Sequence, residues 1–157
     1  MVKNSTEKNE RGLSATSIVD SIKSLPKNLL PPVEKWNPPF CGNLDIRIAR
    51  DGTWFYLGTP IGRPELVKLF SSILKKEEDK YFLVTPVEKV GITVDDAPFV
   101  AVDFNQQNQG GSNVLIFETQ VGDEIVAGPL NPIWVSINQQ TKEPSPYILV
   151  RRNLEAL

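Results

Sequence analysis

Apolar and polar residues alternate between Leu44 and Leu57 on both sides of the dipeptide Asp51-Gly52. A period of two is typical of a half-buried β-strand, and Asp-Gly best suits a two-residue type I′ turn. The segment is therefore predicted to form a β-hairpin. Counting outward from this turn gives two faces, an aliphatic one with Ile46, Ile48, Phe55 and Leu57 and an aromatic-basic one with Arg47, Ala49, Trp54 and Tyr56.

A helix that starts at Pro64 is expected to cover the aliphatic face of this hairpin. Proline suits the first turn of a helix, and an apolar stripe at helical spacing follows it, formed by Leu66, Val67, Leu69, Phe70, Ile73 and Leu74. The charged residues 75–80 are expected to be the solvated end of that helix and a turn.

The N-terminal residues carry weaker signals. Residues 1–15 are polar and charged, so we expect a disordered tail. Residues 16–40 predict a short amphipathic helix followed by a proline-rich extended segment, in which Trp36 and Phe40 are expected to be buried against the body.

The second half of the chain is expected to be nearly all β. A strand over residues 81–94 is interrupted at Pro86, where we place the change of lobe. Further strands are predicted at 99–105, 113–119, 124–127, 133–137 and 147–151, and a short helix at 153–157. The fold class is α+β, mostly antiparallel, with two small β-rich lobes over residues 41–86 and 87–157 and one covering helix in the first lobe.

Composition excludes several classes of site. The chain has no histidine, which rules out Ser-His-Asp triads, Cys-His dyads and histidine-based metal motifs. Cys41 is the only cysteine, so neither an intrachain disulfide nor a cysteine-cluster zinc site can form. We expect no metal and no cofactor. The net charge of −2 disfavours non-specific binding of nucleic acid or of an anionic membrane.

The chain gives no targeting signal. Its N-terminus lacks the apolar core of a signal peptide, and no apolar run is long enough to span a bilayer. With a single cysteine, these features predict a cytoplasmic protein.

Two stretches carry a family resemblance: CGNLDIRIARDGTWFYLGTPIGRPELVKLF and YFLVTPVEKVGITVDDAPFVAV. They resemble the bacterial family catalogued as domain of unknown function 1285, strongly from Trp36 to Val102 and more loosely to the C-terminus. The resemblance implies a duplicated core and a C-terminal lobe loosely similar to pleckstrin-homology folds. It also implies a cytoplasmic protein with a small-ligand site between its lobes, a nucleotide-like ligand and a role in signalling.

The aromatic-basic face supplies the first ligand-binding candidates, Arg47, Trp54 and Tyr56. Aromatic rings can stack on a flat ligand while a guanidinium meets an anionic group. Packing of both rings in the core is the structural alternative. Arg63 precedes a helix start, where free N–H groups favour an anion, although it could instead pair with Asp45.

Three further candidates, Thr85, Glu88 and Lys89, lie at the proposed change of lobe. Polar groups on a broken strand can converge on a ligand. A structural ion pair from Glu88 to Lys89 or Arg47 is an equally good alternative. Asp95 and Asp96 are interpreted as turn residues, because neighbouring carboxylates point apart.

These candidates favour a module that binds a small anionic, nucleotide-like molecule in a sensory role, without catalysis. An enzyme that uses carboxylate and arginine or lysine chemistry is one alternative, and a structural or interaction scaffold is the other.

Overall fold

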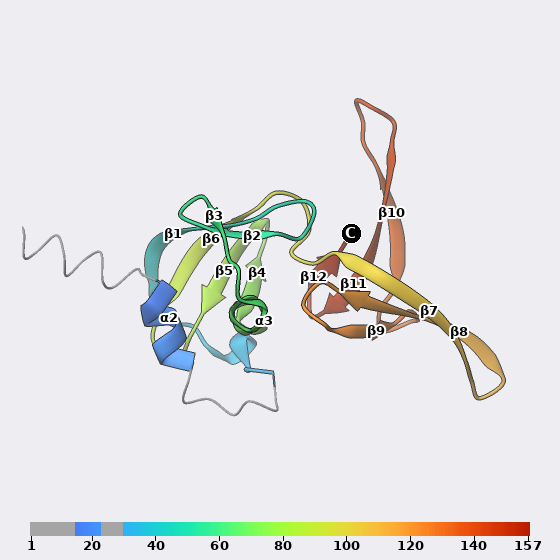
Figure 1. The fold of residues 1–157 in the computed structure, drawn as a ribbon, viewed down its shortest axis with the longest axis horizontal. Coiled ribbons are helices and arrows are strands. Elements are labelled where there is room, and N and C mark those ends of the chain that lie inside the picture. Colours follow the sequence, from blue (N-terminus) through green and yellow to red (C-terminus); the bar gives the residue numbers. More distant parts are fainter. Residues whose placement is uncertain (1–14, 23–29) are drawn as a thin grey trace, which may run out of the picture. The chain divides into compact units, whose positions relative to one another are not determined.

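The computed structural model of the protein describes residues 15–22 and 30–157. These form two compact units, one of residues up to Arg47 with 54–93, and one of residues 48–53 with 94–157. The expected tail over residues 1–15 lies almost wholly outside the described residues. Figure 1 labels the α-helices and the strands. In chain order the elements are α2 (Ala15–Ile22), the short 3-10 helix η1 (Val33–Lys35), β1 (Phe40–Ile48), β2 (Trp54–Tyr56), β3 (Thr59–Pro60), α3 (Pro64–Ser72), β4 (Leu74–Glu77), β5 (Lys80–Val84), β6 (Lys89–Val94), β7 (Ala101–Gln109), β8 (Ser112–Thr119), β9 (Glu124–Val126), β10 (Ile133–Ile137), β11 (Pro144–Arg151) and β12 (Leu154–Ala156).

The first unit is built on one six-stranded sheet with the order β3-β2-β1-β6-β5-β4. Its β2–β3, β4–β5 and β5–β6 pairs are antiparallel. Helix α3 packs through Phe70, whose ring stacks on Trp54 of β2. Both side chains are almost fully buried, so they lie at the centre of the core.

The predicted hairpin is present, but its register differs by one residue from the prediction. Ala49 N–H donates to Thr53 O and Gly52 N–H donates to Ala49 O, which closes a three-residue turn with Gly52 at φ +87°. Further out, Leu57 N–H donates to Asp45 O. This register places Arg47 opposite Phe55.

The prediction that Phe55 and Leu57 lie on the buried aliphatic face is therefore wrong. Ile46 and Ile48 are buried as expected, whereas Phe55 is half-buried and Leu57 is 65% exposed. The buried partner on β2 is Trp54, because the longer turn moves every residue of β2 to the opposite face.

The charged stretch after α3 forms a strand where a helix end was expected. The helix ends at Ser72, and residues 74–77 form β4, which pairs Leu74 with Leu83 and Glu77 with Lys80. The two-residue turn at Glu78 and Asp79 joins β4 to β5. Long-range pairing thus overrides the helical pattern of this segment.

Two aromatic residues of the proline-rich segment are less buried than expected. Trp36 is half-buried, and Phe40 is 56% exposed. The Phe40 ring lies edge-on to the Phe82 ring, with the two ring centroids 6.0 Å apart. The helix predicted before this segment is present as α2, with Ile18 and Ile22 buried.

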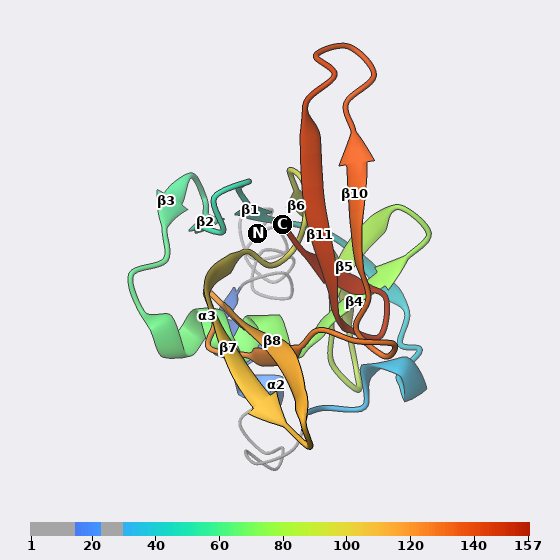
Figure 2. The ribbon, with the colours of Figure 1, turned by 90° about the vertical axis from the view of Figure 1, so that its right-hand side faces the viewer.

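The second unit has two three-stranded antiparallel sheets, ordered β7-β8-β9 and β10-β11-β12. Figure 2 shows β10 and β11 as a long hairpin. The predicted terminal helix is wrong, because residues 154–156 form β12 against β11, and Ala156 also bridges Phe99.

The boundary between the units falls at the last residue of β6, between Thr93 and Val94. Sequence patterning placed it between residues 86 and 87, whereas the contacts keep residues up to Thr93 in the first unit and assign the turn 48–53 to the second. Within the second unit Asp95 N–H donates to Ile48 O, and Gly52 lies against Val100 and Gln120. No helix in the part of the chain that the structure describes is long and apolar enough to cross a membrane.

Candidate functional site

The hairpin residues proposed from sequence do not share one face. Trp54 is 2% exposed and stacks on Phe70, with ring centroids 6.3 Å apart, so its ring is a core element. Tyr56 is half-buried on the same side of β2, and its hydroxyl lies 3.5 Å from Ala15 N. Arg47 lies on the other face, where its guanidinium sits 5.6 Å from the centroid of the Phe55 ring.

Arg63 stands where the sequence placed it, directly before the first turn of α3. It is exposed, and its backbone carbonyl accepts hydrogen bonds from Leu66 and Val67. No ion pair joins Arg63 to Asp45 among the described residues, so the structure does not bring the proposed pair together.

Thr85 and Glu88 build the turn between β5 and β6. The fully buried Thr85 hydroxyl accepts hydrogen bonds from the N–H groups of Val87 at 3.3 Å and Glu88 at 3.1 Å. The half-buried Glu88 carboxyl interacts with the hydroxyls of Ser17 and Ser21 on α2. Burial raises the pKa of Glu88 and outweighs those two hydroxyls, which lower it. Both residues thus serve the local fold.

Lys89 is occupied by neighbours on the same sheet. Its ammonium lies 2.5 Å from Glu77 Oε2 and 4.3 Å from the centroid of the Phe82 ring. The hydrogen bond from Lys89 is the main cause that lowers the pKa of Glu77. The predicted ion pair of Glu88 with Lys89 or with Arg47 is therefore wrong, because Lys89 pairs with Glu77 and the Glu88 carboxyl interacts with Ser17 and Ser21.

A polar and aromatic cluster that the sequence did not single out lies in the second unit. Arg50, from the turn after β1, places Nε 3.2 Å from Asp96 Oδ2. Its Nη2 donates to the Ser145 hydroxyl on β11 at 3.2 Å. Two residues along β11, the Tyr147 hydroxyl donates to Asp96 Oδ1 at 2.7 Å. Residues from three distant segments therefore meet at one carboxylate.

Trp134 extends this cluster onto β10. It is the direct cross-strand partner of Tyr147, and the two rings stack with centroids 5.9 Å apart and planes 22° apart. Directly paired residues of an antiparallel ladder share a face, so Trp134, Tyr147 and Ser145 lie on the side that Arg50 contacts. We call Arg50, Asp96, Trp134, Ser145 and Tyr147 the Arg50 site.

The Arg50 site combines a fixed cation with an accessible ring. The Arg50 side chain is 64% exposed, and its Nη1 has no hydrogen-bond partner among the described residues. Trp134 is 37% exposed. Burial, and then the Asp96 carboxylate, raise the pKa of Tyr147, so the phenol stays protonated and keeps donating to Asp96.

The sequence holds only faint signals for this site. Its members are separated by up to 97 positions, and they meet only because β11 returns beside the turn after β1. At Asp96 the sequence indicates only a turn. An arginine next to the Asp51-Gly52 turn was the one local hint, since turn residues are disproportionately functional.

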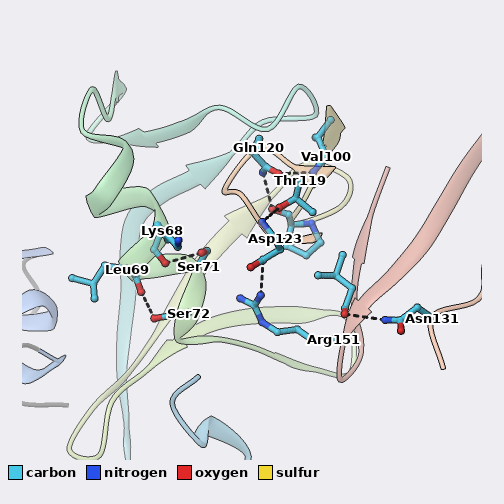
Figure 3. A network of polar contacts seen from close by, with 12 residues as sticks. Lys68, Leu69, Ser71, Ser72, Val100, Thr119, Gln120, Asp123, Asn131 and Arg151 are labelled. Carbon is cyan, nitrogen blue, oxygen red and sulfur yellow. Dashed lines mark hydrogen bonds and ion pairs between the residues drawn. The ribbon is translucent and has the colours of Figure 1, made fainter. Parts of the chain in front are cut away.

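Arg151 anchors a second polar network, drawn in Figure 3. Its Nη1 donates to Asp123 Oδ2 at 2.7 Å, and its guanidinium lies 4.9 Å from the centroid of the Phe99 ring. Asp123 N–H donates to the buried Thr119 hydroxyl. The Arg151 side chain is 12% exposed, and burial lowers its pKa. This network lies inside the unit and holds its strands together.

The structure offers little for a metal. Within residues 15–22 and 30–157, no group of three or more aspartate, glutamate or cysteine side chains is placed to hold a metal ion. Cys41 is exposed, and its thiol lies 3.3 Å from Pro39 O.

Comparison with known proteins places the chain in a family. Residues 31–97 match the family model described as domain of unknown function (DUF1285), N-terminal domain, and residues 98–157 match protein of unknown function (DUF1285), C-terminal domain. The border between the two models falls close to the border between the structural units. No protein with a curated description matches.

Two crystal structures support the same assignment. A DUF1285 family protein from Silicibacter pomeroyi DSS-3 is 59% identical, with a TM-score of 0.80 over 89% of this chain and 76% of that one. Another, from Shewanella baltica OS155, is 36% identical, with a TM-score of 0.55 over 71% of this chain and 80% of that one. By sequence and fold alike, this chain belongs to the DUF1285 family, whose function is not known.

Proposed function

We propose that the protein binds a small, planar, anionic molecule of the nucleotide type, and that the Arg50 site receives it. The observation that carries the proposal is an exposed guanidinium and an exposed indole on one face of the β10–β11 hairpin, where Arg50 bonds to Ser145 and Trp134 stacks on Tyr147. A guanidinium recognises phosphate or carboxylate through paired N–H groups, and an indole offers a flat surface for stacking.

The geometry of Arg50 supports recognition of an anion. Asp96 and Ser145 hold Nε and Nη2, so the guanidinium is oriented before a ligand arrives. Orientation before binding lowers the entropic cost of association. The two N–H groups on Nη1 are left to bind an oxyanion.

Asp96 affects which ligand is favoured. Its carboxylate offsets part of the Arg50 charge, which weakens attraction for a simple ion such as phosphate. A ligand that adds stacking on Trp134 to one charged contact gains from both residues. Nucleotides have this combination, so they are the class we favour.

The proposed role is sensory and cytoplasmic. An exposed, unpaired thiol at Cys41 fits a reducing compartment. Binding alone can act as a signal if the ligand stabilises the fold or orders the hairpin. An enzyme would need a reacting group in addition to the binding contacts, and the Asp96 carboxylate is already engaged by Arg50 and Tyr147.

A thermal-shift titration tests the proposal with three probes: adenosine monophosphate, adenosine and inorganic phosphate. A ligand at a hundred times its dissociation constant stabilises the fold by about 2.7 kcal/mol. We expect the largest shift with the nucleotide, a smaller one with the nucleoside and the smallest with phosphate. Equal absence of a shift with all three would overturn the proposal for this ligand class.

Variants separate the Arg50 site from the site first proposed from sequence. Arg50→Gln and Trp134→Ala should each abolish most of the nucleotide shift, while Lys35→Gln, which removes one exposed charge elsewhere, should preserve it. Arg63→Gln is the decisive comparison. Loss of the shift in Arg63→Gln but not in Arg50→Gln would assign binding to the start of α3. If Arg50→Gln instead unfolds the protein, the cluster is a structural clamp and the scaffold alternative is favoured.

A further inference from the structure

Strand β10 is an exposed sheet edge with an unusual composition. It ends the order β10-β11-β12, and all five of its residues, Ile133–Ile137, are exposed. Ile133, Val135 and Ile137 are 47%, 56% and 49% exposed and lie on one face. Apolar side chains and an open backbone edge thus occur together on this strand.

The backbone groups of these same three residues point to the open edge. Leu149 N–H donates to Pro132 O, and Asn138 N–H donates to Glu143 O, so the even-numbered positions bond to β11. In an antiparallel ladder the N–H and C=O groups of alternate residues point to opposite sides. The backbone N–H and C=O groups of the odd-numbered residues, Ile133, Val135 and Ile137, therefore point away from β11.

Other sheet edges in the described chain carry protection that β10 lacks. Strand β4 carries Lys75, Lys76 and Glu77, β3 has two residues and ends in proline, and β9 has three residues that begin with Glu124. Strand β7 has a register irregularity near Asp103, and β12 is bridged by Phe99. Charge, proline, shortness and bulges are the usual means of preventing edge pairing. Strand β10 has none of these between its ends.

The sequence of β10 suits pairing with itself. Read in either direction, the exposed face carries isoleucine, valine and isoleucine at alternate positions. A two-fold axis through Val135 would place Val135 opposite its own copy and Ile133 opposite Ile137 of the second copy. No charged residue lies on the strand, so this register brings no like charges together.

We propose that β10 is a homodimer interface, in which two copies pair antiparallel about Val135 into one continuous sheet. All three pairs have backbone groups directed at the partner, so each pair can exchange two hydrogen bonds. A five-residue strand is a small contact, which makes the dimer weak and dependent on concentration. The dimer would use the open edge of β10 and the face of Ile133, Val135 and Ile137, whereas Arg50 contacts Ser145 of β11 on the other face. The dimer proposal therefore does not rest on ligand binding.

Sedimentation equilibrium of the full chain over a range of concentrations tests the dimer. We expect the apparent mass to rise toward twice the monomer value for the parent. Val135→Lys and Val135→Glu should each stay monomeric, because the substituted residue faces its own copy. A parent that remains monomeric at every concentration overturns the proposal, as does a dimer that both variants preserve.

Mixing the two variants tests the position of the axis. Val135→Lys with Val135→Glu places opposite charges across the axis, so the mixture should form a heterodimer although neither variant dimerises alone. A mixture that remains monomeric overturns the pairing about Val135. Phe104→Lys, which changes an exposed apolar residue on β7, is the matched control and should dimerise like the parent.

The Ile133 and Ile137 positions give a second variant set that remains informative if Val135 variants fail to fold. A chain carrying both Ile133→Lys and Ile137→Glu should still dimerise, since each lysine would face a glutamate of the other copy. A chain carrying lysine substitutions at both positions should be monomeric. A monomeric lysine–glutamate chain together with a dimeric lysine–lysine chain would overturn the register.

Discussion

The rings of Trp54 and Phe70 stack with their centroids 6.3 Å apart and their planes 17° apart, which fixes helix α3 to strand β2. Both side chains are at most 2% exposed. The Trp54 indole nitrogen is buried without a hydrogen-bond partner among the described residues. The contact therefore combines a large apolar stabilisation with the cost of one unsatisfied donor.

Replacement of Trp54 should reveal these two effects separately. We expect Trp54→Ala to lower the free energy of unfolding by about 3 to 5 kcal/mol, as large aromatic truncations in cores do. Trp54→Phe keeps a ring beside Phe70 and removes the unsatisfied N–H, so it should cost clearly less. Urea unfolding measures both. Equal losses for the two variants would show that ring stacking contributes little.

Gly52 is expected to tolerate no side chain, for two reasons. Its φ of +87° is unfavourable for other residues, and an added Cβ would lie 3.1 Å from Val100 and Gln120 side-chain atoms. Gly58 has a similar φ of +80° with no atom within 4 Å of an added Cβ. Gly58→Ala should therefore cost about 1 to 2 kcal/mol and Gly52→Ala more. The denaturant midpoints of the two variants measure both losses. The difference between the losses gives the cost of the contacts with Val100 and Gln120.

Glu88 should make stability depend on pH in a defined direction. Burial raises its pKa above the ordinary 4.5, so the folded protein holds the proton more tightly than the unfolded chain does. The resulting gain in unfolding free energy is fully present below the pKa of Glu88 in the unfolded chain. It is lost as pH rises through the pKa of Glu88 in the folded protein, so the unfolding free energy falls there. Glu88→Gln should remove that fall in unfolding free energy between acidic and neutral pH. The exposed Glu78→Gln should keep it, and a fall that persists in Glu88→Gln would contradict the assignment.

Arg151 and Asp123 should be strongly coupled. Removal of Arg151 alone leaves a partly buried carboxylate without its cation, and we expect Arg151→Met to cost about 3 kcal/mol. Removal of both charges, by adding Asp123→Asn, should recover part of the loss. A double-mutant cycle by urea unfolding gives the coupling energy. Strictly additive losses would mean that the pair contributes only through packing of Arg151 on Phe99.

Local sequence patterns predicted most of the elements but not how they pair. The Asp51-Gly52 turn was recognised, yet two-residue and three-residue closures use the same dipeptide, and the choice moves Trp54 from one face to the other. Strand β4 follows the apolar stripe of α3 without a break, and only its pairing with β5 identifies it as a strand. The segment 154–156 likewise predicts a helix, and only its pairing with β11 makes it the strand β12.

The candidate site was harder to predict, because contacts between distant residues form it. The sequence favours Thr85 as a polar group at a broken strand, but its hydroxyl already accepts two hydrogen bonds from the turn itself. Arg50 had the same residue type as Arg47 and stood three positions away, but only the return of β11 distinguishes it. The pattern of a single sequence shows neither the hydrogen bonds of Thr85 nor the position of β11 beside Arg50.

The turn at residues 48–53 has a consequence for dissecting the protein. It belongs by its contacts to the second unit, although the chain of the first unit runs on both sides of it. No single cut can therefore release the second unit complete. A fragment that starts at residue 98, where the second family model begins, would lack Arg50 and would leave Val100 and Gln120 without Gly52. The two family domains can be separated in an alignment, but the folded units are interlaced along the chain.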